Sequence, residues 1–345
     1  MALDYQTETR LRVTEKLREL SEKLPEAARL YLRYIADSRQ PLTRLGYARD
    51  LALFFDFLSE RGYGADPVKV KPDMIIEFSE YLALYERARK IGGKTVTVAV
   101  SNSARGKSRK LSAVRSFYRW MYRRGQIVTD PTALIEMPRI SSKNVVALEP
   151  NEAADLLDAA EFGDGIPTDR GMALHEERKE RDLALLSLLL GTGMRVSECV
   201  GIDLAHLDME SSAVKVTRKG GAETVLYFGE EVAAALRSYL VKRAAMKPLP
   251  GHENALFISR KRTRLRQRQI EYLVKNYARG AVPIKTITPH KLRSTFGTNL
   301  YRETGDIYLV ADVLGHKDVN TTTARYAKVD ENRRRLARTL RLRED

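Results

Sequence analysis

The sequence LALLSLLLGTGMRVSE spans residues 183–198. Residues 183–190 are apolar apart from Ser187, and a run of this length is far too short to cross a bilayer, so it predicts a buried helix. The Gly-Thr-Gly sequence at 191–193 predicts a turn that ends this helix and begins another. Arg195 and Glu198 stand three positions apart, which places both on one face of the second helix. The stretch therefore predicts a helical domain with a charged pair beside a tight turn.

Around this stretch, one β element is predicted among helices. Residues 213–219 and 222–228 favour strands, and the Gly-Gly pair between them is a typical two-residue hairpin turn. We expect a helix over 230–246, a short strand over 256–258 and helices to the end of the chain. The stretch 161–180 is predicted to be a surface loop without a chemical role.

The first part of the chain has the 3.6-residue period of helices. The clearest apolar stripe predicts a helix that packs on one face, and it consists of Tyr47, Leu51, Phe54, Phe55 and Leu58. A second stripe is expected from Leu30, Tyr31, Tyr34 and Ile35. Residues 91–108 are interpreted as a loop, or as a loop with a short hairpin over 95–100. A helix with several basic faces is expected over 107–124.

These patterns divide the chain into two domains, which is the number expected for 345 residues. Residues 1–23 are a polar extension that is helical in part, and residues 24–138 form an all-helical domain. Residues 139–149 lack periodicity and are predicted to be a linker. Residues 150–345 form a mixed but mostly helical second domain, with a tail at 331–345. The predicted fold class is mainly α with a small β-hairpin.

Composition limits the possible functions. The chain carries 60 Lys and Arg against 45 Asp and Glu, a net charge of +15. This excess favours a polyanionic partner, with nucleic acid first and an anionic membrane surface second. The single cysteine, Cys199, excludes an internal disulfide and is expected to be a buried thiol. Because the first residues lack an apolar signal core, we expect a cytoplasmic protein.

Several chemically active side chains remain in the second domain. The sequence TPHKLR at 288–293 predicts a helix that begins at Thr288 and places His290 and Arg293 on its first turn. The other candidates are Arg195 with Glu198, Lys219 at the hairpin turn, His316 after Leu314-Gly315, and Tyr326. Each alone has an ordinary structural explanation, such as a surface ion pair or a packed tyrosine. Together, with no recognisable cofactor or metal motif, they suit metal-free attack on a phosphodiester.

The order and spacing of these residues resemble the tyrosine recombinase, or phage integrase, family, which includes Xer recombinases and mobile-element integrases. The resemblance covers nearly the whole chain, since the first domain is similar to the helical, SAM-like core-binding domain of that family. It implies a site-specific recombinase that needs neither metal nor ATP. It also implies a role in chromosome dimer resolution or in integration and excision of a mobile element.

The resemblance also implies a role for each residue. Tyr326 would be the nucleophile that forms a 3′-phosphotyrosyl bond, and Arg195 and Arg293 would hold the phosphate oxygens. Lys219 would protonate the leaving 5′-oxygen, with Lys215 as the alternative. The remaining three have assisting roles: His290 in proton transfer, His316 in a hydrogen bond to the phosphate, and Glu198 in orienting the arginine and histidine.

Basic residues outside this site are predicted to contact DNA. One group lies on the helix expected at 107–124 or just before it: Arg105, Lys107, Arg109, Lys110 and Arg115. The other is a run with six basic residues in nine, the cations being Arg260, Lys261, Arg262, Arg264, Arg266 and Arg268. A solvated charged face is the simpler alternative for both.

The expected partner is double-stranded DNA with two inverted half-sites. The resemblance suggests a homo-tetramer, or a tetramer with a paired homologue, held together by exchange of the tail at 331–345. Two other functions use the same residues or the same charge. One is a type IB topoisomerase, which relaxes DNA without exchanging partners; the other is a DNA-binding factor without catalytic activity.

Overall fold

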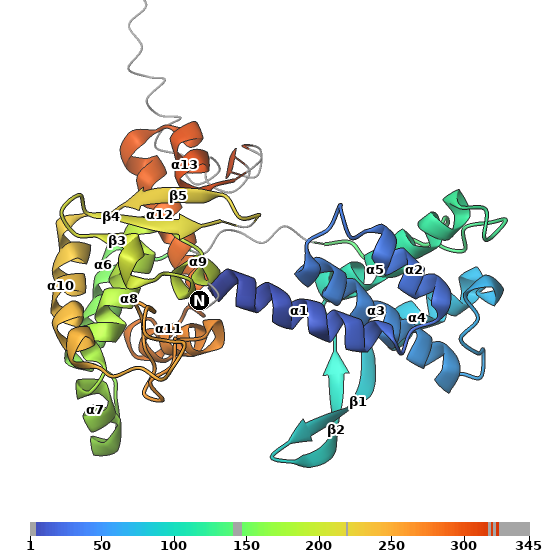
Figure 1. Cartoon of the computed structure of the whole chain (residues 1–345), viewed down its shortest axis with the longest axis horizontal. Coiled ribbons are helices and arrows are strands. Elements are labelled where there is room, and N and C mark those ends of the chain that lie inside the picture. The colour runs from blue at the N-terminus through green and yellow to red at the C-terminus, as the bar shows by residue number, and fades with distance from the viewer. Residues whose placement is uncertain (1–4, 141–146, 219, 317–318, 320–321, 324–345) are drawn as a thin grey trace, which may run out of the picture. The chain divides into compact units, whose positions relative to one another are not determined.

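The computed structural model describes residues 5–140, 147–218, 220–316, 319, 322 and 323. The chain divides into two compact units, Met1–Ser142 and Lys143–Asp345, which are taken separately below (Figure 1). Among the described residues, no helix combines the length and apolarity needed to cross a membrane. The mainly helical class predicted from the sequence is confirmed.

The first unit is a helical bundle with one β-ribbon. Its elements are α1 (Tyr5–Ser21), α2 (Glu26–Tyr34), α3 (Pro41–Glu60), η1 (Pro67–Lys69), α4 (Pro72–Tyr81), β1 (Leu84–Ile91), β2 (Lys94–Ser101) and α5 (Ala104–Arg123). α1 packs against α3 and buries Leu17, so the described part of the polar extension contributes to the core of this unit.

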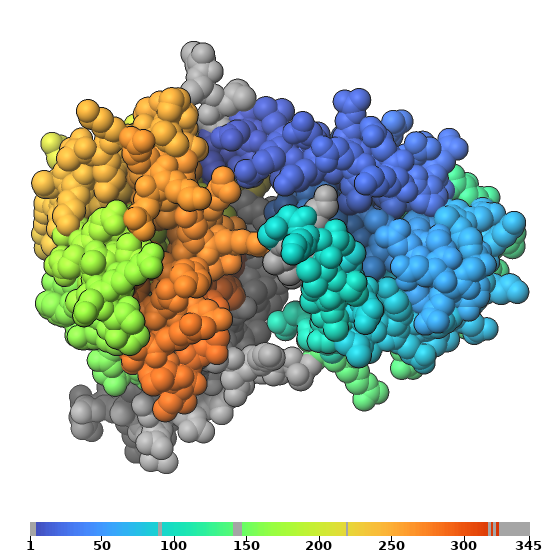
Figure 2. Space-filling view, turned by 90° about the horizontal axis from the view of Figure 1, so that it is seen from below, coloured from blue at the N-terminus to red at the C-terminus, as the bar shows by residue number. Residues whose placement is uncertain are grey.

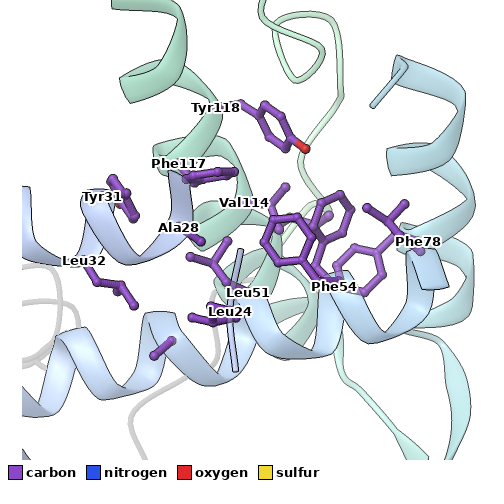
Figure 3. Packing of buried hydrophobic residues seen from close by; sticks show 14 of the residues in the cluster. Leu24, Ala28, Tyr31, Leu32, Leu51, Phe54, Phe78, Val114, Phe117 and Tyr118 are labelled. Atoms are coloured by element: carbon purple, nitrogen blue, oxygen red, sulfur yellow. The ribbon is translucent and has the colours of Figure 1, made fainter. Parts of the chain in front are cut away.

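The core of the first unit is built from aromatic rings around α3 (Figure 3). Phe54 meets Phe78 edge to face with ring centroids 5.0 Å apart, and it meets Tyr118 at 6.2 Å. Such edge-to-face pairs add stabilisation beyond the burial of their area. The predicted stripe on α3 is buried or half-buried as expected. The stripe predicted near Leu30 is wrong in part, because Tyr31 and Ile35 are buried whereas Leu30 and Tyr34 are exposed.

The second unit is built around α8 (Lys179–Thr192), which contains the apolar run 183–190. Its other elements are α6 (Pro150–Phe162), α7 (Asp169–Glu176), α9 (Val196–Val200), η2 (Leu204–His206), β3 (Leu207–Asp208), β4 (Ala213–Thr217), β5 (Glu223–Tyr227), α10 (Glu230–Ala245), α11 (Gln267–Ala281), α12 (Pro289–Thr304) and α13 (Ile307–Leu314). α6, α10 and α12 pack against α8, and most apolar side chains of α8 are buried.

The β structure differs from the prediction in three places. The strands of the predicted hairpin are shorter than expected and join β3 in an antiparallel sheet of order β3-β4-β5. The segment 256–258 is not a strand: Ile258 forms an isolated bridge with Arg264, and Ala255, just before the segment, forms another with Asp203. The segment 91–108 is not mainly a loop, because β2 and the start of α5 occupy most of it.

The predicted surface loop at 161–180 is also wrong. It contains α7, and His175 at the end of that helix is fully buried. His175 Nδ1 lies 3.1 Å from the Tyr277 hydroxyl, which donates to Asp182 Oδ2 over 3.1 Å. Arg181 and Asp182 form a buried ion pair at 2.6 Å. This chain of polar groups connects α7 to α8 and α11. The periodicity of the sequence did not predict it.

Candidate active site

The turn between α8 and α9 presents the first arginine. Gly193 adopts φ +61°, and a Cβ there would lie 2.4 Å from the ring of Phe296, so this position requires glycine. Arg195 follows as the N-cap of α9. Its Nη1 lies 2.7 Å from Glu198 Oε1, and its backbone N–H donates to Glu198 Oε2 at 2.7 Å. The Glu198 side chain is 3% exposed and that of Arg195 is 33% exposed, so a buried carboxylate orients a partly exposed guanidinium.

The first turn of α12 presents the second arginine and a histidine. Pro289 is the first residue of this helix, as predicted, and the exposed His290 follows it. Arg293 is only 4% exposed. Its Nη1 donates to the carbonyl oxygen of Gly193 at 2.7 Å, and its Nη2 donates to that of Leu314. Arg293 therefore joins the α8–α9 turn to the end of α13.

Three arginines converge on the C-terminal end of α13. The carbonyl oxygens of Val313, Leu314 and Gly315 accept hydrogen bonds from the Nη2 atoms of Arg218 (2.8 Å), Arg293 and Arg195 (3.3 Å), respectively. The C-terminal end of a helix carries partial negative charge, which stabilises nearby cations. The helix end thus gathers guanidinium groups from three distant segments at one place.

Arg218 is a site residue that sequence reasoning missed. Its Nε donates to Thr224 Oγ1 at 3.1 Å, while Nη1 is buried without a hydrogen-bond acceptor among the described residues. Burial lowers the pKa of the Arg218 guanidinium, and the nearby Glu198 carboxylate opposes this shift. The only signal in the sequence was its position beside Lys219, because its partner Val313 lies 95 positions further on.

The turn after α13 places the second histidine. Gly315 ends the helix with φ +59°, and a Cβ there would fall 1.6 Å from Arg218 Nη1, so both its conformation and its surroundings require glycine. His316 Nδ1 lies 2.7 Å from Thr322 Oγ1. The structure thus brings together Arg195, Glu198, Arg293 and His316, and it places His290 on the first turn of the helix that carries Arg293.

Two predicted catalytic residues, Lys219 and Tyr326, lie outside the described residues, as does the tail at 331–345. The alternative lysine, Lys215, lies on β4 and pairs with Glu223 at 3.4 Å on the exposed side of the strand. Within the described ranges, no cluster of His, Cys, Asp and Glu has the composition of a metal site.

The predicted DNA contacts of the first unit fall into two groups. Arg105 is exposed and Lys107 is half-buried at the start of α5. The other three are engaged within the unit: Arg109 pairs with the buried Asp50, Lys110 donates to Asn102 Oδ1 at 2.6 Å, and Arg115 donates to the carbonyl of Ile135. Burial raises the pKa of the Asp50 carboxyl, and the hydrogen bonds and charge of Arg109 only partly oppose this shift.

The basic run of the second unit is divided in the same way. Arg264 is 8% exposed and donates to the carbonyl oxygens of Val200 and Ile202, both at 2.9 Å, and to Asp203. The others are exposed, with Arg260 3.4 Å from Glu177. A groove of about 900 Å³ lies beside them, and its basic lining residues are Arg178, Arg181, Arg260, Lys261, Arg268 and Arg279.

Comparison with known proteins identifies the family and the fold. The model of the Phage integrase family matches residues 147–333, and that of the phage integrase N-terminal SAM-like domain matches residues 28–125. The chain belongs to the phage integrase family. Its function is that of a site-specific tyrosine recombinase, which confirms the family and the enzyme class predicted from the sequence.

This tyrosine recombinase has relatives that match most of its length. It is 32% identical over 340 residues to tyrosine recombinase XerC of Caldanaerobacter subterraneus, covering 94% of this chain and 90% of the relative. It is 31% identical over 305 residues to XerC of Chlorobaculum tepidum, covering 86% and 88% of the two chains.

Solved structures share the fold. The XerH site-specific recombinase in a pre-cleavage complex with its difH substrate superposes with a TM-score of 0.63 at 19% identity, covering 96% of this chain and 95% of that one. The Tn1549 transposon integrase in complex with circular intermediate DNA gives 0.65 at 21% identity, covering 91% and 99%.

Proposed function

We propose that this tyrosine recombinase breaks and rejoins duplex DNA through a covalent bond between Tyr326 and a scissile phosphate. The observation that carries the proposal is the gathering of Arg195 and Arg293 at neighbouring carbonyls where α13 ends. A cluster of guanidinium groups at a fixed place can stabilise the negative charge that develops on a phosphate under attack. The sequence reaches Tyr326 shortly after this helix end.

The reaction consists of two balanced transfers. In the first, the Tyr326 oxygen attacks phosphorus, a 3′-phosphotyrosyl bond forms, and the bond to the 5′-oxygen breaks. His290 accepts the phenolic proton and Lys219 supplies a proton to the leaving 5′-oxygen. In the second, a 5′-hydroxyl of a partner strand attacks the phosphotyrosyl phosphorus and gives its proton to Lys219, and the bond to the Tyr326 oxygen breaks as His290 returns a proton to that oxygen. One phosphoester bond is exchanged for another at each step, so no nucleoside triphosphate is consumed.

The geometry supports different tasks for the two arginines. Arg195 is one-third exposed and held by Glu198, so it is the guanidinium best placed to meet a phosphate oxygen. Arg293 is buried, so it both adds positive charge and fixes the turn at Gly193. His316 contributes a hydrogen bond to the phosphate, and Arg218 holds the helix end that positions the whole set.

We infer that residues 24–138 form the core-binding domain, that 139–149 link it to the catalytic domain at 150–345, and that both bind one DNA half-site. The exposed cations Arg105, Lys261, Arg262, Arg266 and Arg268 would neutralise phosphates, because their side chains face solvent. Two inverted half-sites would carry two protomers, and four protomers, or two pairs of homologues, would assemble through the tail at 331–345. The enzyme would act on DNA in the cytoplasm, in chromosome dimer resolution or in movement of a mobile element.

Covalent trapping tests this proposal. A binding site is first selected from random duplex DNA, and a nick is placed beside the scissile phosphate so that the released fragment diffuses away. The full-length protein should then accumulate an adduct of DNA on Tyr326, and Tyr326→Phe should bind the same DNA without forming one. Equal adduct yields from both proteins, or none from the parent on DNA that it binds tightly, would overturn the mechanism.

The selected DNA also distinguishes a recombinase from two other kinds of protein. A strand-relaxing topoisomerase would relax supercoiled plasmid that lacks the selected site, whereas a recombinase should exchange strands only between two copies of the site. A DNA-binding factor without catalytic activity would bind the nicked site and leave it intact.

A further inference from the structure

A two-stranded ribbon projects from the first unit (Figure 1). β1 and β2 each contain eight residues and pair antiparallel from Leu84 with Ser101 to Ile91 with Lys94. Gly92 and Gly93 join them with φ values of +57° and +83°, which suits a two-residue hairpin turn with a positive φ at both positions. In Figure 2 the ribbon, coloured teal, lies at the surface and faces the viewer.

The base of the ribbon is fixed to the helices. Tyr85 is 6% exposed and stacks on Tyr81 with centroids 5.1 Å apart. Asn102, just after β2, donates from Nδ2 to the carbonyl of Leu82 at 2.8 Å and accepts from Lys110 Nζ at 2.6 Å. The ribbon is therefore held by packing and hydrogen bonds at one end and projects from a firm base.

The outer part of the ribbon has no covering layer among the described residues. Residues 92–97 are exposed, and Val96, the third residue of β2, is 44% exposed. A hairpin by itself is only marginally stable in water, and an uncovered strand edge is a site for pairing or binding. Strands of eight residues that continue beyond the core therefore point to a partner that covers them.

The chemistry of the ribbon matches that of duplex DNA. Residues 84–101 contain four basic residues and one acidic residue, a net charge of +3; the basic ones are Arg87, Arg89, Lys90 and Lys94. β2 alternates Thr95, Val96, Thr97 and Val98. Lysine, arginine and threonine donate to phosphate oxygens, and small apolar groups contact thymine methyl groups. The major groove is wide enough for a two-stranded ribbon.

The position of the ribbon supports the same partner. β2 leads through Asn102 and Ser103 into α5, where Arg105 is exposed on the first turn. The basic start of α5 and the basic ribbon are thus neighbours in the chain. At about 3.3 Å per residue, eight residues reach roughly 26 Å, which is the length of about eight base pairs.

We propose that the β1–β2 ribbon is a DNA-binding arm that lies in a groove of the duplex and extends the contact made by the start of α5. The proposal rests on the proposed function for the nature of the partner. It adds a contact surface that the catalytic chemistry does not need. Loss of the arm should therefore weaken DNA binding while leaving the rate of bound-state cleavage unchanged.

A shortened arm tests the proposal in the full-length protein. Deleting residues 88–91 and 94–97 joins Arg87 to Val98 through the original Gly92-Gly93 turn, and these two residues are already antiparallel partners. Because four residues leave each strand, every remaining side chain stays on its face of the ribbon. Three basic residues leave with them, so the slope of log affinity against log salt should fall by roughly two to three.

The expected loss of affinity for the selected duplex is about 10- to 100-fold at moderate salt. Hydroxyl-radical protection should also retreat by several base pairs on one side of the site. Unchanged affinity, salt slope and footprint would overturn the proposal. The adduct yield at saturating protein is measured in parallel, so that failure of the covalent chemistry is seen separately from failure of the arm.

Point variants distinguish DNA from a second copy of the chain. Lys90→Glu with Lys94→Glu should weaken binding of a single protomer to a half-site more than Lys90→Gln with Lys94→Gln does. Val96→Lys places a charge beside the other valines of β2, Val98 and Val100, and it should preserve or strengthen DNA binding. If Val96→Lys instead abolishes assembly of protomers while half-site affinity stays at the parent value in all variants, the ribbon binds another protomer and the proposal is wrong.

Discussion

Arg195 and Arg293 donate hydrogen bonds to adjacent carbonyl oxygens, those of Gly315 and Leu314, at the end of α13. The two side chains begin on different helices, and neither contact is local in sequence. Their separation is therefore set by the fixed spacing of one helix end, which places two positive charges at a defined distance before DNA is bound. Such preorganisation is what a developing phosphate charge requires.

Removing the third arginine should disturb this arrangement. Arg218→Ala should lower the rate of adduct formation by about 10- to 100-fold, because small displacements of catalytic groups have effects of this size. DNA affinity should stay within about threefold, since Arg218 is mostly turned toward the protein, and Arg218→Lys should recover part of the rate. Arg237→Ala, which removes an exposed arginine paired with Glu230, is the control and should retain the parent rate.

Gly315→Ala should lower the rate of adduct formation by more than backbone strain alone explains. Alanine at positive φ costs about 1–2 kcal/mol, and at Gly315 its Cβ would also overlap Arg218. Gly251→Ala also places an alanine at positive φ, at +84°, but with nothing within 4 Å of its Cβ, so it measures the effect of backbone strain without a clash. The check is the rate of adduct formation in both variants and in Gly315→Ala with Arg218→Ala. A double variant no better than the product of the single effects would show that the two side chains do not interact.

The buried carboxylate of Glu198 should matter for stability as well as for rate. Glu198→Gln keeps the shape of the side chain but removes the charge that holds Arg195, so adduct formation should slow while the fold persists. Glu198→Ala leaves the Arg195 N–H and guanidinium without their partner, and it should lower the free energy of unfolding by about 3 kcal/mol. Urea unfolding and single-turnover cleavage measure the two effects separately, and equal behaviour of the two variants would contradict this assignment.

The first unit offers a matched pair that separates folding from DNA contact. Arg109→Ala should destabilise the protein by about 1–3 kcal/mol, because it leaves Asp50 buried without its cation. Arg105→Ala should leave the melting temperature unchanged and reduce the salt slope of DNA binding by about one. A result in which Arg109→Ala weakens DNA binding at unchanged stability would place Arg109 in the DNA interface instead.

Cys199 should make the stability of the second unit fall in alkali. Burial, aided by the Glu198 charge, raises the pKa of the thiol to about 12. Above the ordinary thiol pKa of about 8.5 the unfolded chain loses this proton and the folded chain keeps it, so stability falls as pH rises toward 12. Urea titrations from pH 8 to 10 should show a smaller decline for Cys199→Ala. The single native thiol should also react with a disulfide reagent only as fast as the protein opens.

Much of the fold follows from local patterns, and the exceptions have a physical cause. The α8–α9 turn was predictable because Gly193 and Arg195 follow an apolar run, and the start of α12 because Thr288 and Pro289 mark it. The length of the β1–β2 ribbon and the buried His175 were missed, because cross-strand pairing and a hydrogen bond to Tyr277 depend on residues that are distant in sequence.

The same distinction holds for the site. Residue types and order indicated Arg195, Glu198, His290, Arg293 and His316, whereas Arg218 could be found only once α13 was placed against the β4–β5 turn. For the basic residues, sequence showed the charge but not its partner. In the sequence, Arg264 and Arg109 look the same as Arg262 and Arg105, because all four stand in basic stretches. In the structure, however, Arg264 donates to backbone carbonyls and Arg109 pairs with an aspartate of its own unit.

The helix that accepts all three guanidinium groups is also the last described helix before the segment that carries Tyr326. The carbonyl oxygens of Val313, Leu314 and Gly315 are consecutive, so a shift of the end of α13 moves the three acceptors together. The cationic half of the reaction centre can thus be assembled or disabled in a single movement.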